Sequence, residues 1–277
     1  MTLNNAMSNT PWSPARPPLK AKGRVQTWVT SQWKLLASPG HFSAAINTQR
    51  RARQHLQAFL LRHGHIYSGR KAWSLAHERW IARLKFEHPT HYVVLKEYCQ
   101  TVEDSAVRLQ RLTDLISETV DSWTMAPVVR AYQALRGVAL LSAVVFVVEI
   151  GDVRRFENPR QLMAFLGLVP SESSTGEHVR RGSITKAGNR RARRVLIEGA
   201  WTYRFPARVG RTQQAQLEGL PREVREIAWK GQVRPCSRYR KMISAGKHKA
   251  ITVTAIAREM GAFLWAIGQE VQPAPQA

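Results

Sequence analysis

The sequence contains little cysteine and no long apolar run. Its only cysteines, Cys99 and Cys236, have no nearby Cys or His at metal-ligand spacing, which excludes a disulfide scaffold and a structural zinc site. The longest apolar run, Val138 to Val148, is interrupted only by Ser142 and is shorter than the roughly 20 residues that a membrane span needs. Met1 to Pro18 lacks the apolar core of a signal peptide. We therefore expect a reducing compartment, a buried helix over the apolar run and no membrane partner.

Acidic residues are absent from the first part of the chain. None precedes Glu78, whereas the same stretch carries eleven Lys and Arg residues. Over the whole chain, 42 Lys and Arg against 19 Asp and Glu give a formal net charge of +23. Such a charge opposes compaction by self-repulsion, and a polyanionic partner relieves it. Nucleic acid is the expected partner, because each base placed on a phosphate releases counterions; an anionic membrane surface is the alternative.

The periodicity of apolar residues predicts a mainly α fold. Regular structure is expected from about Arg51, with Leu56, Phe59, Leu60 and His63 on one helical face and a helix end near Gly64. A second helix is expected over 71–84, with Trp73, Ala76 and Trp80 on one side. The segment before about residue 48 is rich in Pro, Ser and Trp without sustained periodicity, which favours a poorly ordered basic arm.

A heptad pattern follows Pro89. Its apolar seam advances in alternating steps of three and four over about three repeats, through Leu95, Tyr98, Val102, Ser105, Leu109, Leu112 and Ile116. The pattern fits a two-helix coiled coil within or between subunits, and it equally fits an amphipathic helix packed on its own domain.

A helical hairpin is expected after Pro127, because the apolar stretch 131–150 is broken at Arg136-Gly137-Val138. Helix starts attract anions, so such a turn can receive a DNA phosphate. The alternative is packing within the core.

The most distinctive segment reads GLVPSESSTGEHVRRGSITKAGNRRARRVLIEGAW, from Gly167 to Trp201. Its glycines Gly176, Gly182 and Gly188 recur every six residues, a spacing typical of turns or of close backbone approach. Between and after them lie the bases that we select as candidate DNA contacts: Arg180, Arg181, Lys186, Arg190, Arg191, Arg193 and Arg194.

The last four of these bases open a predicted helix that Asn189 caps. Cations at a helix start oppose the helix dipole, at about 0.3–1 kcal/mol each when exposed, and a bound anion reverses that sign. The pattern therefore favours a phosphate site over the alternative of a solvated basic face.

Hydroxyl side chains precede the bases, at Ser171, Ser173, Ser174 and Thr175. A hydroxyl on a Gly-flanked turn facing several guanidinium groups fits nucleophilic attack on a phosphodiester. Ser, Thr and Gly are also common in ordinary turns, so this reading stays open beside the structural one.

The motifs GLVPSE, RRG, ITKAGN and RRARRVLIEGAW, with RGVALLSAVVFVVEIGD and FENPRQLMAFLGL upstream, resemble the transposases of a group of bacterial insertion sequences. The resemblance covers roughly residues 51–269. It implies a family that joins an amino-terminal RuvC-like domain, bearing a DEDD acidic tetrad, to a carboxy-terminal serine-bearing domain. The family is related to pilin-gene-inverting recombinases, and members are guided by a structured bridge RNA.

The resemblance also implies where this chain departs from the pattern. The acidic tetrad would hold divalent metal (Mg), yet the chain has no carboxylate before Glu78, so we expect no cofactor or metal site in this chain and a truncated transposase. The family places its nucleophilic serine directly before the glycine, where this chain has Thr175 with Ser174 one residue earlier; both remain candidates.

The resemblance and the patterns together give a definite expectation. Residues 1–48 form an unmatched basic arm, 49–125 a helical linker and coiled coil, and 126–272 a compact helical transposase domain with basic Gly-rich loops. We expect DNA transposition with strand cleavage and rejoining, DNA and structured guide RNA as partners, homo-oligomers through the coiled coil, and a cytoplasmic, nucleoid-associated location. The alternative is a catalytically inactive remnant that binds nucleic acid, so whether this chain is an enzyme stays open.

Overall fold

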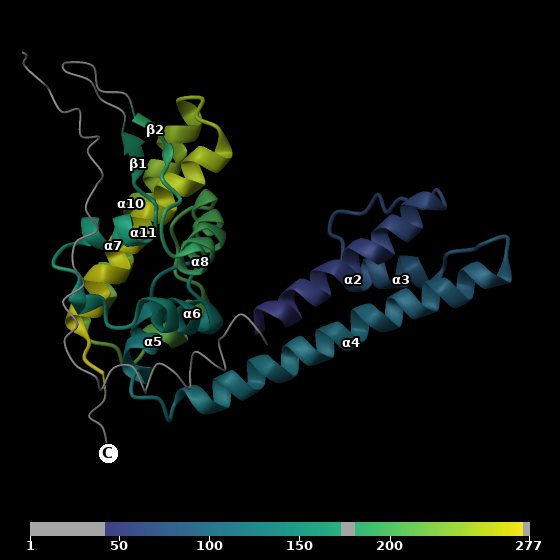
Figure 1. Cartoon of the computed structure of the whole chain (residues 1–277), viewed down its shortest axis with the longest axis horizontal. Helices are drawn as coiled ribbons and strands as arrows, with labels where there is room; N and C mark the ends of the chain where they lie inside the picture. Colours follow the sequence, from purple (N-terminus) through teal and green to yellow (C-terminus); the bar gives the residue numbers. More distant parts are fainter. Residues whose placement is uncertain (1–41, 173–180, 274–277) are drawn as a thin grey trace, which may run out of the picture.

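The computed structural model describes residues 42–172 and 181–273, which form an extended helical arm and a compact helical body (Figure 1). The arm contains α2 (Phe42–Arg62), α3 (Leu75–Ala82) and α4 (Pro89–Val120). The body contains α5 (Ala126–Gln133), α6 (Leu140–Ile150), η1 (Val153–Arg155), α7 (Pro159–Phe165), α8 (Arg190–Ala200), η2 (Trp201–Arg204), α9 (Arg211–Leu217), α10 (Arg222–Ser244) and α11 (Lys249–Glu270). Two short strands, β1 (Pro170–Glu172) and β2 (Arg181–Ile184), pair antiparallel. The prediction of a mainly α fold is confirmed.

In the arm, α2 packs along α4 around a small core of its own. That core consists of Leu56, Phe59, Leu60, Ile81 and Leu95. The helix end near Gly64 is confirmed, since α2 stops at Arg62 and Gly64 adopts a left-handed φ of 75°.

Two expectations for the helical arm were wrong. Helix α2 begins at Phe42, well before Arg51, so residues 42–48 are helical despite their weak periodicity; packing against α4 stabilises what local propensity does not. The second helix, α3, begins at Leu75 rather than near residue 71, and Ala76 is exposed. Trp73 and Trp80 do pack against the core of the arm. His63, although exposed, shares the face of Phe59 as expected, with the two ring centroids 4.6 Å apart.

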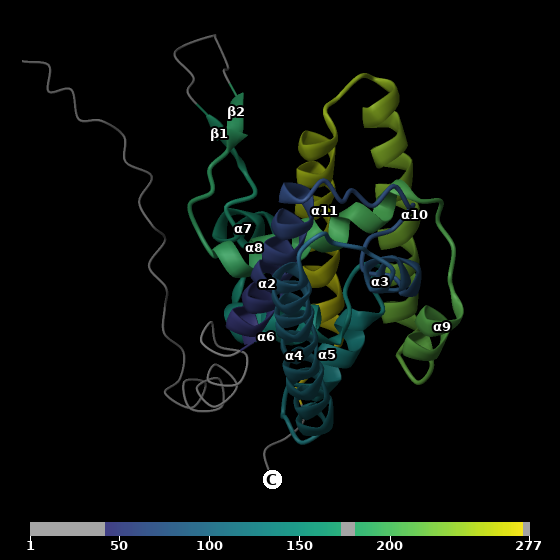
Figure 2. The same ribbon diagram turned by 90° about the vertical axis from the view of Figure 1, so that its right-hand side faces the viewer.

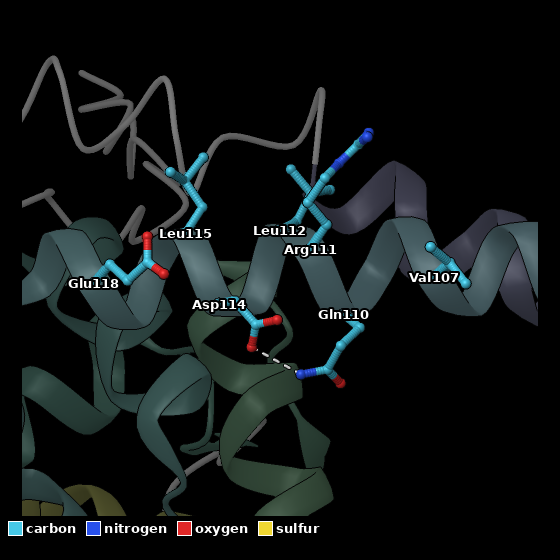
Figure 3. A pocket seen from close by; sticks show the side chains of 7 residues that line it. All are labelled: Val107, Gln110, Arg111, Leu112, Asp114, Leu115 and Glu118. Atoms are coloured by element: carbon cyan, nitrogen blue, oxygen red, sulfur yellow. Dashed lines mark hydrogen bonds between the residues drawn. The ribbon is translucent and has the colours of Figure 1, made fainter.

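The heptad seam of α4 faces its own chain. Leu95, Tyr98 and Val102 pack in the core of the arm, while Leu109, Leu112 and Ile116 pack against the core of the body. The seam is therefore used within the chain, as the alternative of an amphipathic helix packed on its own domain predicted. Beside this seam, the exposed Val107 and Leu115 border an open hollow, which the partly buried Leu112 and polar side chains of α4 also line (Figure 3).

Helix α11 is the central helix of the body. It packs against α5, α7, α8 and α10 and buries Val253, Ile256, Met260, Leu264 and Ile267. Among the described helices, α11 is long and apolar enough to cross a membrane by length and composition, and half of that window is buried inside the body. This burial is what a core helix requires, and a single such helix is weak support for a membrane span. The expected buried helix over the apolar run is confirmed as α6.

The turn between α5 and α6 packs inside the body. Gly137 has a φ of 84°, and a side chain there would collide with the carbonyl of Gly199 in α8. The hydroxyl of the buried Tyr203 donates to the carbonyl of Arg136 at 2.9 Å. The two-helix hairpin is thus confirmed, and its turn serves core packing.

Candidate nucleic-acid interface

Glycines fasten the basic loop to the body before α8 begins. Gly167 (φ 64°) and Gly188 (φ 143°) both adopt backbone conformations that favour glycine. A side chain at Gly188 would collide with the carbonyl of Phe165, and one at Gly167 would lie 2.8 Å from the carbonyl of Ala187. Gly182 likewise passes close to Ser171. The expected close backbone approach is therefore observed at Gly188, whereas the close neighbour of Gly182 is the side-chain hydroxyl of Ser171.

Backbone hydrogen bonds fix the same loop. The amide of Asn189 donates to the carbonyl of Phe165 at 3.0 Å, and the amide of Lys186 donates to that of Gly167 at 3.2 Å. Lys186 itself adopts a φ of 55°, which is uncommon for a residue with a side chain. The loop therefore presents its side chains from a well-anchored backbone.

Asn189 caps α8, as the sequence predicted. Its side-chain oxygen accepts from the amides of Arg191 and Ala192, each at 3.0 Å. Its side-chain nitrogen donates to Oε2 of Glu149 at 2.7 Å, and Oε1 of Glu149 accepts from Arg191 at 2.9 Å. The anion expected at this helix start is thus supplied, in part, by the chain itself.

The seven candidate DNA-binding bases fall into different environments. Arg193 is buried, and its guanidinium donates to the carbonyl of Leu166 at 2.8 Å, so it joins α8 to the end of α7. Arg191 pairs with Glu149, and Arg194 pairs with Glu198 at 2.7 Å. Lys186 and Arg190 are exposed, and neither forms an ion pair within the described part of the chain. Among the five candidate bases whose side chains the structure describes, these two are the most available to a phosphate.

The remaining candidates belong to the connection between the two strands. Ser174, Thr175, Gly176 and Arg180 lie outside the described residues, as does the side chain of Arg181. The pairing of Glu172 with Arg181 brings the two ends of that connection together beside the anchored loop. The structure therefore fixes where the connection starts and ends.

Sequence reasoning missed Glu149 and Leu166 as parts of this site. Glu149 is the only carboxylate within the apolar helix α6, and that isolation in the sequence was a usable signal. Leu166 contributes through its backbone carbonyl, which accepts the hydrogen bond from Arg193. No side-chain pattern in the sequence could predict a contact with a backbone carbonyl. Across 42–172 and 181–273, no three His, Cys, Asp or Glu side chains are placed to hold a metal ion.

Comparison with known proteins identifies the segment that carries this site. Residues 130–214 match the family model described as the transposase IS116/IS110/IS902 family. Two similar curated proteins are a putative transposase, y4qE, from Sinorhizobium fredii (strain NBRC 101917 / NGR234) and the transposase for insertion sequence element IS1533 from Leptospira borgpetersenii. The first is 46% identical over 230 residues, covering 83% of this chain and 56% of the relative. The second is 27% identical over 201 residues, covering 69% of this chain and 56% of the relative.

A third match is confined to a shorter stretch. The transposase for insertion sequence element IS1111A of Coxiella burnetii is 41% identical over 68 residues, covering 24% of this chain and 19% of that protein. The chain spans about half the length of the first two relatives. The segment that matches the IS116/IS110/IS902 family model, residues 130–214, includes the anchored loop and α8.

Proposed function

We propose that this chain acts in DNA transposition and binds DNA through the anchored loop and the start of α8. The supporting observation is a pair of exposed cations, Lys186 and Arg190, that form no ion pair within residues 42–172 and 181–273 and lie on a backbone held by Gly167, Gly188 and the Asn189 cap. A rigid loop loses little conformational entropy when its bases settle on phosphates. Arg191 and Arg194 are expected to contribute less to DNA affinity, because each already forms an ion pair with a carboxylate.

The test is the affinity of the full chain for a 20-base-pair duplex as salt is raised. Replacing Lys186 and Arg190 by Ala should flatten the slope of log affinity against log salt by about one unit per lost phosphate contact. The matched control replaces Arg108 and Arg111, two exposed bases on α4, and should leave the slope nearly unchanged. Equal slopes for both variants would refute the assignment of the DNA-binding surface to the loop.

Strand cleavage and rejoining is the finer part of the proposal. A hydroxyl of Ser174 or Thr175 would attack a phosphodiester, form a protein–DNA phosphoester and release one strand end as an alcohol. The bases of the loop would offset the charge that grows on the phosphoryl oxygens. Thr175 matches the family position, but its β-branch restricts its rotamers, which favours Ser174 on chemical grounds. The family resemblance implies that a separate domain carries the acidic tetrad and its divalent metal. It also implies that the structured RNA binds to the intact complex.

Covalent capture tests this step. The chain is mixed with the amino-terminal acidic domain of a full-length relative, the RNA and a target duplex, and protein–DNA adducts are resolved on a denaturing gel. Ser174→Ala should abolish the adduct if Ser174 attacks, and Thr175→Val should abolish it if Thr175 does. Adducts that survive in the double variant would contradict the hydroxyl assignment.

A further inference from the structure

A second basic surface lies on the far side of α11 from the anchored loop. Figure 2 shows β1 and β2 on one side of α11, and α9 and α10 on the other. Helix α10 carries seven Lys and Arg residues and two Glu residues. The segment that leads into α9, residues 204–211, reads RFPARVGR and contains three arginines and no acidic residue. We call this segment the strap.

The backbone of the strap is held against the body by inward hydrogen bonds. The buried Gln232 donates from Nε2 to the carbonyl of Arg208, and Cys236 donates from Sγ to the carbonyl of Phe205 at 3.3 Å. Arg136 donates to the carbonyl of Pro206 at 2.8 Å. Burial raises the pKa of the Cys236 thiol, which keeps the proton of its hydrogen bond in place.

Because the carbonyls point inward, the longer side chains of the strap point out. Arg204, Phe205, Arg208, Val209 and Arg211 are all exposed. Phe205 is 53% exposed, with the guanidinium of Arg204 lying 4.7 Å from its ring centroid. An exposed aromatic ring beside arginines places a stacking surface next to positive charge, the two features that single-stranded nucleic acid uses.

Helix α10 adds a second aromatic side chain to the same surface. Trp229 is 48% exposed and lines one shallow hollow together with Val209 of the strap. Trp229 precedes Gln232 and Cys236, the two α10 residues that hold the strap, by three and seven positions. This spacing places all three residues on one flank of the helix. Lys230 and Arg240 are exposed on α10 and form no ion pair with any residue that the structure describes.

We propose that the strap and the adjoining face of α10 bind an unpaired DNA strand, a role separate from the loop but resting on the proposed action on DNA. The arginine side chains would bind the phosphates, while Phe205 and Trp229 would stack on the nucleobases of the strand. A duplex keeps its bases stacked on each other, so only an unpaired strand can use both aromatic faces. An anionic membrane would also attract Lys, Arg and aromatic side chains. Membrane binding, however, requires a wide apolar helix face, and the exposed face of α10 is mostly charged.

The experiment compares the full chain with a Phe205→Ala, Trp229→Ala variant. Binding is measured for a fluorescein-labelled 20-mer of thymidine and for a 20-base-pair duplex. The variant should bind the single strand about tenfold more weakly, with duplex affinity within about twofold of the parent. The matched control, Leu61→Ala with Leu75→Ala, removes two exposed apolar side chains from the arm and should leave both affinities unchanged. Thermal melting confirms that each variant is folded.

The outcomes separate the two proposals. If the aromatic variant binds the single strand as tightly as the parent, the strap proposal is wrong, whatever the loop does. If the aromatic variant behaves as expected but Lys186→Ala with Arg190→Ala leaves the duplex slope unchanged, only the role of the loop is wrong. Binding of a uridine 20-mer more than tenfold tighter than the DNA strand, or tighter binding to phosphatidylglycerol vesicles than to DNA, would overturn the choice of ligand.

Discussion

Glu149 joins α6 to the start of α8 through both of its carboxylate oxygens. One oxygen orients the capping Asn189, and the other neutralises Arg191. Its side chain is only 18% exposed, whereas that of Arg191 is 43% exposed. Under the proposed binding of DNA, we expect Glu149 to position Asn189 and to compete with a phosphate for Arg191.

Glu149→Gln separates these two effects. The glutamine oxygen can still accept from Asn189, but the charge that competes for Arg191 is gone. We expect duplex affinity to rise about two- to fivefold, with little change in stability because partly exposed ion pairs contribute little. Glu149→Ala should instead lower the free energy of unfolding by about 1 kcal/mol through the lost hydrogen bond.

The control for this prediction is Glu198→Gln, which makes the same chemical change at the more exposed partner of Arg194. It should raise the affinity less than Glu149→Gln, since Arg194 sits farther from the helix start. A Glu149→Gln protein that binds DNA more weakly than the parent would show that the carboxylate supports binding rather than competing with it.

At the scale of elements, the close passage of Gly188 under the end of α7 holds the loop. Gly188→Ala would place a methyl group against the carbonyl of Phe165 in a backbone conformation unfavourable for alanine. We expect a loss of about 1–3 kcal/mol in the free energy of unfolding, measured by urea denaturation. Gly210→Ala is the control, because nothing lies within 4 Å of its added carbon. Equal midpoints for the two variants would contradict the claim that the close approach is obligatory.

Self-association through α4 stays a prediction, but the structure changes which residues test it. Leu109 and Leu112 pack against the body, so charges there would destabilise the fold and confuse the result. Val107 and Leu115 are exposed at 63% and 44% on α4 (Figure 3). Replacing both with Lys should convert an oligomer to a monomer without unfolding it, as measured by sedimentation. A parent protein that is already monomeric would disprove self-association.

Several elements could be predicted from sequence because their causes are local. The Asn189 cap, the Gly137 turn and the start of α8 each follow from a few neighbouring residues. The early start of α2, the inward use of the α4 seam and the burial of Arg193 could not, because each depends on a partner far away in the chain. Glu149 lies forty residues from Asn189, and only the fold brings the two together.

At the scale of the whole molecule, the +23 charge is divided among distinct surfaces. The anchored loop and the strap lie on opposite sides of α11 (Figure 2). If both proposals hold, we expect one body to bind a duplex and an unpaired strand at the same time.

The salt dependence of duplex binding by the unmodified chain is the sharpest test of whether this protein binds DNA. Affinity should be measured by fluorescence anisotropy between roughly 50 and 200 mM salt, where counterion release governs binding. If Lys186, Arg190, Arg191 and Arg194 each contact one phosphate, the slope of log affinity against log salt should be about −3.6. A slope near zero, or no binding at the lowest salt, would contradict the account of this chain as a DNA-binding part of a transposase.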